Sequence, residues 1–167
     1  YTERPVSDEV FEAYRQLYNY DRTPLNASVV SADTTEAWVR ERIDLDAGSG
    51  GERLTAFLYL PRGGNGPHQT VVYYPGSGVI YRRSYDDVSI DNIEFLVRGG
   101  RAVLFPIYMG TFERGTDLRS DIQDETNGYR DHVIAWTKDL RRSVDYLATR
   151  DEIDMDRLAY LGISWGG

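Results

Sequence analysis

Hydrophobic positions follow a strand period in several stretches of the chain. Apolar and polar residues alternate over 38–46 and again over 54–60, with a glycine-rich turn at 47–51 between them. This pattern predicts an antiparallel hairpin, and the charges on its first strand favour a place at the edge of a sheet. Continuous apolar runs at 70–74 and 102–105 predict two strands buried on both faces.

Other stretches have the spacing of helices. The clearest is 129–149, whose apolar residues step by three or four: Val133, Trp136, Leu140, Val144 and Leu147. A second helix is predicted over 86–97, ended by Gly99-Gly100. The polar stretch 108–128 lies between them as a long loop that could line a pocket.

Residues 1–35 are interpreted as a helical attachment segment, and 36–167 as the main domain. Ser7-Asp8-Glu9 is a good helix start. The apolar and aromatic residues after it have helical spacing and are expected to pack on the core. A turn-rich connector at 21–26 follows.

Composition narrows the class of protein. The chain has 167 residues, is 41% hydrophobic and 28% charged, and carries a net charge of −8. These values fit a globular domain and argue against nucleic acid or an anionic membrane as partner. Without cysteine there is no thiolate metal site or thiol nucleophile, and we expect neither a cofactor nor a bound metal. The sequence has no signal-peptide pattern, which favours the cytoplasm, although a removed leader is compatible with a start at Tyr1.

The last residues carry the strongest chemical motif. An apolar run, 158–161, leads into Gly162-Ile163-Ser164-Trp165-Gly166-Gly167. The pattern Gly-x-Ser-x-Gly is typical of a nucleophile elbow, in which a strand turns sharply at a serine and continues as a helix. Side chains at Gly162 and Gly166 would collide with the neighbouring elements. Ser164 is therefore the candidate nucleophile, and the backbone N–H of Trp165 is a candidate oxyanion donor.

A second glycine-rich turn follows the buried strand 70–74. Pro75-Gly76-Ser77-Gly78 stands at the carboxyl end of that strand, where open α/β sheets place their sites. In hydrolases a loop at this place supplies a second oxyanion N–H. Ser77 is the candidate for that donor, with Gly78 next to it.

Together these features resemble the first half of an α/β-hydrolase. The resemblance covers about residues 36–167, and 139–147, 154–158 and the elbow are similar to dienelactone hydrolases, acetyl xylan esterases and prolyl oligopeptidases. Residues 73–78 and 21–25 also resemble the hydrolase-like region appended to some bacterial serine/threonine kinases. The resemblance implies a sheet with an antiparallel N-terminal hairpin, then parallel strands with flanking helices. It also implies an ester or acyl substrate of small size, with Ser164 as nucleophile and Trp165 and Ser77 as oxyanion donors.

The triad acid and histidine follow the serine in this family's chain order, and no residue of this sequence follows Gly167. His68 and His132 are interpreted as surface residues. We therefore expect an esterase that is incomplete in these residues alone, completed by a C-terminal half or another chain. A non-catalytic binding or regulatory module and a serine peptidase remain as alternatives.

Overall fold

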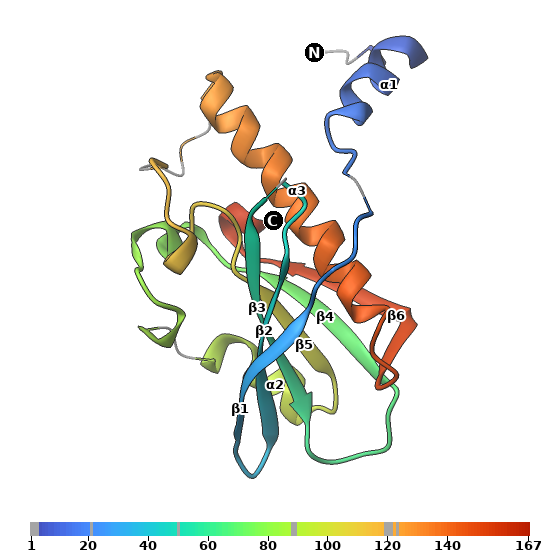
Figure 1. Cartoon of the computed structure of the whole chain (residues 1–167), viewed down its shortest axis with the longest axis vertical. Coiled ribbons are helices and arrows are strands. Elements are labelled where there is room, and N and C mark those ends of the chain that lie inside the picture. The colour runs from blue at the N-terminus through green and yellow to red at the C-terminus, as the bar shows by residue number, and fades with distance from the viewer. Residues whose placement is uncertain (1–3, 21, 50, 88–89, 119–121, 123) are drawn as a thin grey trace.

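A mixed β-sheet forms the centre of the molecule. The computed structural model describes residues 4–20, 22–49, 51–87, 90–118, 122 and 124–167. Within these residues, six strands lie in the order β1-β2-β3-β5-β4-β6 (Figure 1). Their bounds are Ser28–Thr34 (β1), Trp38–Asp46 (β2), Arg53–Pro61 (β3), His68–Tyr74 (β4), Ala102–Pro106 (β5) and Ile153–Gly162 (β6). The neighbours from β1 to β5 are antiparallel, whereas β4 is parallel to both β5 and β6.

Helices cover both faces of this sheet. The three α-helices of the described chain are α1 (Asp8–Gln16), α2 (Asp91–Arg98) and α3 (Asn127–Leu147). Short 3-10 turns lie at Ser77–Tyr81, Tyr85–Asp87, Phe112–Arg114 and Ser164–Gly166. No helix in the described ranges combines the length and the apolar character needed to cross a membrane.

Two apolar clusters, one on each face, explain why the inner strands are apolar at successive positions. On β4, Val71 and Tyr73 belong to the cluster under α2, whereas Val72 belongs to the cluster under α3. Residues on β3 and β5 divide in the same way. Because successive side chains of a strand point to opposite faces, a sheet covered on both sides requires continuous apolar runs.

The predicted hairpin and buried strands are confirmed, but the predicted edge position of the hairpin is wrong. β1 pairs with β2 and lies outside it. All seven residues of β1 are exposed, so its sequence has none of the apolar alternation that marks a half-buried strand. The strand is held by backbone pairing and by cross-strand contacts such as the Arg40–Asp33 ion pair.

The expectation that the N-terminal helix packs on the core is also wrong. α1 begins as predicted, because the Ser7 hydroxyl accepts a hydrogen bond from the backbone N–H of Val10. However, α1 has no buried residue, and Phe11 and Tyr14 are 56% and 65% exposed. Figure 1 shows the helix set apart from the sheet. The apolar stripe predicts an amphipathic helix but does not specify what covers it.

Two further element bounds differ from the sequence prediction. The second helix begins at Asp91 rather than at residue 86, and a 3-10 turn occupies Tyr85–Asp87. Positions 88 and 89 of the predicted helix lie outside the described residues. β6 begins at Ile153, five residues before the apolar run at 158–161 that the sequence indicated.

A buried arginine joins the N-terminal connector to the domain. Arg142 on α3 is 1% exposed, and its guanidinium donates hydrogen bonds to three backbone carbonyl groups. The acceptors are Thr23 (3.0 Å), Pro24 (3.2 Å) and Asp46 (3.1 Å). The five donors of a guanidinium can satisfy several carbonyl groups at once, which suits a place where chain segments meet without a strand ladder.

We predict that Arg142→Ala lowers the free energy of unfolding by about 3 kcal/mol, because it leaves buried carbonyl groups without donors. Urea denaturation followed by circular dichroism measures the change. The matched control is Arg130→Ala on the same helix, whose exposed side chain bonds, among the described residues, to Asp131 alone. The control should stay within about 0.5 kcal/mol of the native chain. A loss below about 1 kcal/mol for Arg142→Ala would contradict this assignment.

Candidate active site

Ser164 lies at a sharp turn directly after β6. Its φ is +53°, a left-handed conformation that residues other than glycine seldom adopt. The turn continues as one 3-10 turn, Ser164–Gly166, in which the N–H of Gly166 donates to the carbonyl of Ile163 at 3.0 Å. Ser164 is exposed, and within the described chain its hydroxyl has no hydrogen-bond partner. This geometry presents the hydroxyl outward from the end of the sheet.

The two glycines of the motif are required by close backbone packing. A Cβ on Gly162 would lie 1.9 Å from the carbonyl oxygen of Gly166. A Cβ on Gly166 would lie 2.5 Å from the carbonyl oxygen of Tyr74 and 2.8 Å from that of Pro75. Real Cβ atoms do not approach backbone this closely, so only glycine fits at either position.

The loop after β4 lies beside this turn. Parallel pairing of β4 with β6 aligns Tyr74 with Gly162, and the N–H of Ile163 donates to the carbonyl of Tyr74 at 3.1 Å. A Cβ on Gly76 would be in ordinary contact, 3.7 Å, with the Cβ of Ser164. The structure therefore brings together the two segments that the sequence singled out, the elbow motif and residues 75–78.

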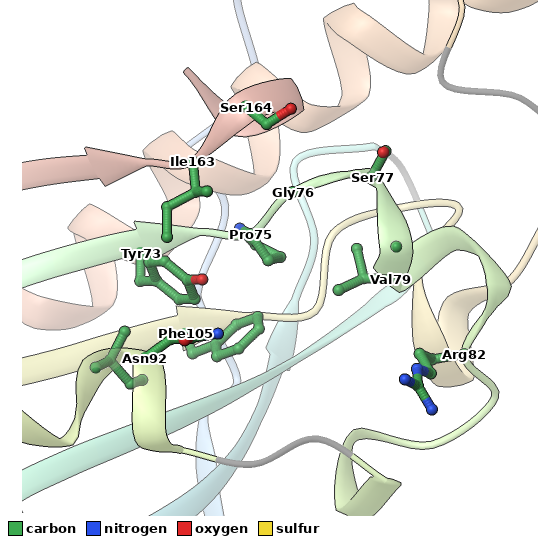
Figure 2. A pocket seen from close by; sticks show the side chains of 12 residues that line it. Tyr73, Pro75, Gly76, Ser77, Val79, Arg82, Asn92, Phe105, Ile163 and Ser164 are labelled. Carbon is green, nitrogen blue, oxygen red and sulfur yellow. The ribbon is translucent and has the colours of Figure 1, made fainter.

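A cavity of about 530 Å³ opens between these two segments. Ser164 and Ser77 both line it, as does Gly78, whereas Trp165 does not (Figure 2). Its apolar wall includes residues of β4, β5, α2 and the 3-10 turn after β4, among them Tyr73, Val79, Ile93 and Phe105. Arg82 and Asn92 also line the cavity. It has the mixed lining of a site for a small, partly apolar molecule.

Trp165, the residue after the candidate nucleophile, is held by aromatic packing. Its indole lies edge-on to Trp136 of α3, with ring centroids 4.6 Å apart, and to Tyr74, at 5.6 Å. Tyr74 stacks in turn on Tyr108 at 3.9 Å. The indole N–H of Trp136 donates to the carbonyl of Met109 at 2.7 Å, which fixes that ring against the loop after β5.

Buried polar groups lie among these rings. Asp139 of α3 is fully buried, pairs with Arg114 and accepts a hydrogen bond from the N–H of Met109 at 3.2 Å. Burial raises the pKa of the Tyr74 and Tyr108 hydroxyls, which therefore stay protonated. This packing joins α3 and the loop after β5 to the residue that follows Ser164.

Neither histidine is hydrogen-bonded to Ser164, and both are partly exposed. His68 is half-buried at the amino end of β4, about 20 Å from its carboxyl end at the rise of a β-strand. His132 is half-buried, and its two ring nitrogens are engaged by the Thr116 hydroxyl and the Gly128 carbonyl, each at 2.8 Å.

Sequence reasoning missed two groups at this site. The aromatic residues behind Trp165 come from three distant segments. The helical period marked Trp136 and the buried-strand run marked Tyr74, whereas Tyr108 lies in the stretch predicted as a polar loop. Arg82 follows Ser77 by five positions in a loop without periodicity. The chain turns after Val79, where the N–H of Arg82 donates to the Val79 carbonyl, and no local pattern predicts that turn.

Comparison with known proteins points to one fold. No family model matches the sequence, and no curated protein matches it. Among solved structures, the chain is similar to acetyl xylan esterase 1 from Thermoanaerobacterium sp., with a TM-score of 0.71 and 16% identity over 97% of this chain and 52% of that one. An acetyl xylan esterase from Paenibacillus sp. R4 has a TM-score of 0.61 and 20% identity, over 93% of this chain and 50% of that one. A glucuronoyl esterase from Solibacter usitatus has a TM-score of 0.55 and 16% identity, over 86% of this chain and 47% of that one.

These similarities confirm the predicted fold class. The six described strands with flanking helices match the α/β-hydrolase fold of carboxylic ester hydrolases. The chain spans about half the length of these solved structures. At this level of identity the likeness concerns the fold, and the roles of individual residues rest on the geometry above.

We predict that Gly166→Ala destabilises the chain by more than about 3 kcal/mol or displaces the turn, because the new methyl group overlaps backbone of β4 and of Pro75. The matched control is Gly128→Ala in α3, where a Cβ would meet nothing closer than 3.7 Å. That control should be neutral or stabilising by up to about 1 kcal/mol. Chemical denaturation measures both. Equal stability of the two variants would show that the elbow backbone does not lie against β4 as described.

Proposed function

We propose that this chain carries the nucleophile of a serine hydrolase that acts on carboxylic esters, and that Ser164 is that nucleophile. The observation that carries the proposal is the left-handed turn at Ser164, exposed beside the loop after β4 and on the wall of a cavity. Strained backbone at such a turn costs free energy and persists only where surrounding structure holds it. The likeness to solved esterases supports the same chemistry.

In the proposed mechanism the Ser164 hydroxyl attacks the ester carbonyl carbon. Its proton passes to a general base as the new C–O bond forms, and the carbonyl oxygen becomes an oxyanion. The tetrahedral intermediate collapses to an acyl-enzyme, and the departing alcohol takes up a proton. Water then attacks the acyl-enzyme by the same steps in reverse, which releases the acid and restores the serine.

The oxyanion is held by backbone N–H groups in this proposal. Trp165 supplies the first, and the aromatic packing of its indole against Trp136 and Tyr74 supports a fixed orientation. Ser77 supplies the second, with Gly78 beside it, from the loop that touches the elbow. Preorganised donors of this kind stabilise charge that develops only during reaction.

The general base and its acid partner are proposed to lie outside residues 1–167. The exposed side chains along β6, the outermost strand of the described sheet, support this view. Tyr160 on β6 is 50% exposed, and Ile163 directly after the strand is 42% exposed. A further part of the protein or another chain would cover this apolar surface. Residues 1–35 are proposed as an attachment segment, held to α3 by Arg141 and Arg142.

A second candidate function is a non-catalytic module with a hydrolase fold. The observation that favours it is the free hydroxyl of Ser164, which no basic side chain of the described residues engages. Such a module would use the same cavity to bind a small molecule without turning it over.

A fluorophosphonate probe that is applied to the protein as the cell produces it distinguishes these two functions. We predict covalent labelling that Ser164→Ala abolishes. Ser77→Ala should keep labelling within a few-fold of native, because only the backbone N–H of that residue is assigned a role. Intact-mass spectrometry reads the label. Equal labelling of native protein and Ser164→Ala would refute the nucleophile, and absence of labelling in native protein would favour the non-catalytic module.

The oxyanion role of Ser77 makes a separate prediction. Ser77→Pro removes the N–H, and proline is tolerated here because Ser77 is the first residue of a helical turn. Gly76 before it has φ −70° and ψ 169°, which a following proline allows. We expect kcat for an ester such as 4-nitrophenyl acetate to fall about 10²- to 10³-fold relative to Ser77→Ala. Equal kcat for the two variants, both folded by circular dichroism, would exclude this donor.

A further inference from the structure

Among the described residues, one charged side chain lines the cavity beside Ser164. Arg82 is ionised at neutral pH, and the other described residues of the lining are apolar, glycine, hydroxyl or amide residues. Figure 2 shows Ser164 and Arg82 at different ends of the cavity, with Val79 between them and Phe105 to one side. The cavity thus has a candidate reactive group at one end, an apolar middle and a cation at the other end.

The guanidinium of Arg82 has no partner in the described part of the chain. Arg82 is exposed, and its side chain forms no hydrogen bond or ion pair there, whereas several other arginines are paired with carboxylates. Arg40 pairs with Asp33, and Arg150 pairs with Glu41 and Glu152. An arginine that stabilises the fold normally has such acceptors, so an unpaired one that lines a cavity is available to a ligand.

The neighbouring arginine does not share this position. Arg83 is absent from the cavity lining, and its guanidinium lies near Gly115, 3.3 Å from where a Cβ of that residue would be. Arg82 and Arg83 therefore carry the same charge at adjacent positions, but of the two only Arg82 lines the cavity, so Arg83 can serve as a control.

We propose that the cavity binds an ester that also carries a carboxylate, with the carboxylate at Arg82 and the ester carbonyl at Ser164. This substrate class rests on the proposed function for the ester part, and on Arg82 for the acid part. The apolar residues between the two ends receive the carbon skeleton. On a chain with a net charge of −8, an exposed, unpaired cation on the wall of a cavity favours an anion that the rest of the surface repels.

The test is a binding measurement that does not depend on catalysis. Monomethyl succinate carries one ester and one carboxylate, and dimethyl succinate has the same skeleton without charge. Both esters are titrated into the Ser164→Ala variant of the protein as the cell produces it, so that neither ester is consumed. Ligand-observed NMR measures the binding. We expect monomethyl succinate to bind about tenfold more tightly, the effect of one charge-assisted contact at a partly exposed site.

The variants assign this preference to one side chain. Arg82→Gln should remove the difference between the two esters, whereas Arg83→Gln should retain it. The preference should also shrink as salt is raised, because the contact is between opposite charges near solvent. Equal binding of both esters, binding of neither, or a preference that survives Arg82→Gln would overturn the proposal.

This outcome is separable from that of the proposed function. Labelling of Ser164 together with equal binding of the esters would refute only the carboxylate. A preference that depends on Arg82 in a protein that no phosphonate labels would retain the anion site and refute only the hydrolase.

Discussion

The site depends on how closely the backbone after β6 approaches the end of β4. That approach is possible because Gly166 has no side chain, so its Cα lies against the carbonyl groups of Tyr74 and Pro75. The contact holds the chain in a turn tight enough to place Ser164 at φ +53°. It also brings the elbow to Gly76, where the two segments that form the cavity meet. One steric condition thus links sheet pairing, serine conformation and the cavity.

The sequence predicted those parts of the fold whose determinants are local. A strand covered on both faces requires a continuous apolar run. The run at 70–74 lies in β4, and the run at 102–105 lies in β5. The sharp turn at Ser164 was predictable because its glycines are required by contacts close to the serine itself. The long helix was predictable from its period alone.

The parts that escaped prediction depend on distant partners. β1 is fully exposed and exists because β2 offers it a backbone ladder, which no pattern within 28–34 encodes. The stripe on α1 predicts an apolar face without naming what covers it. Within the candidate site, Ser164 and Ser77 were predictable as motifs. Arg82 and the rings behind Trp165 reach the site through tertiary packing, so only coordinates place them there.

The three carbonyl groups bound by Arg142 have a consequence for the order of events during synthesis. Two of its acceptors, Thr23 and Pro24, precede it by 119 and 118 residues. Chains grow from the N-terminus at about 5–20 residues per second, so the connector leaves the ribosome several seconds before its anchor is translated. Until α3 has formed, the connector lacks these hydrogen bonds, so α1, which has no buried residue even in the folded chain, is attached only through a free segment. The beginning of the polypeptide is therefore among the last parts to become fixed.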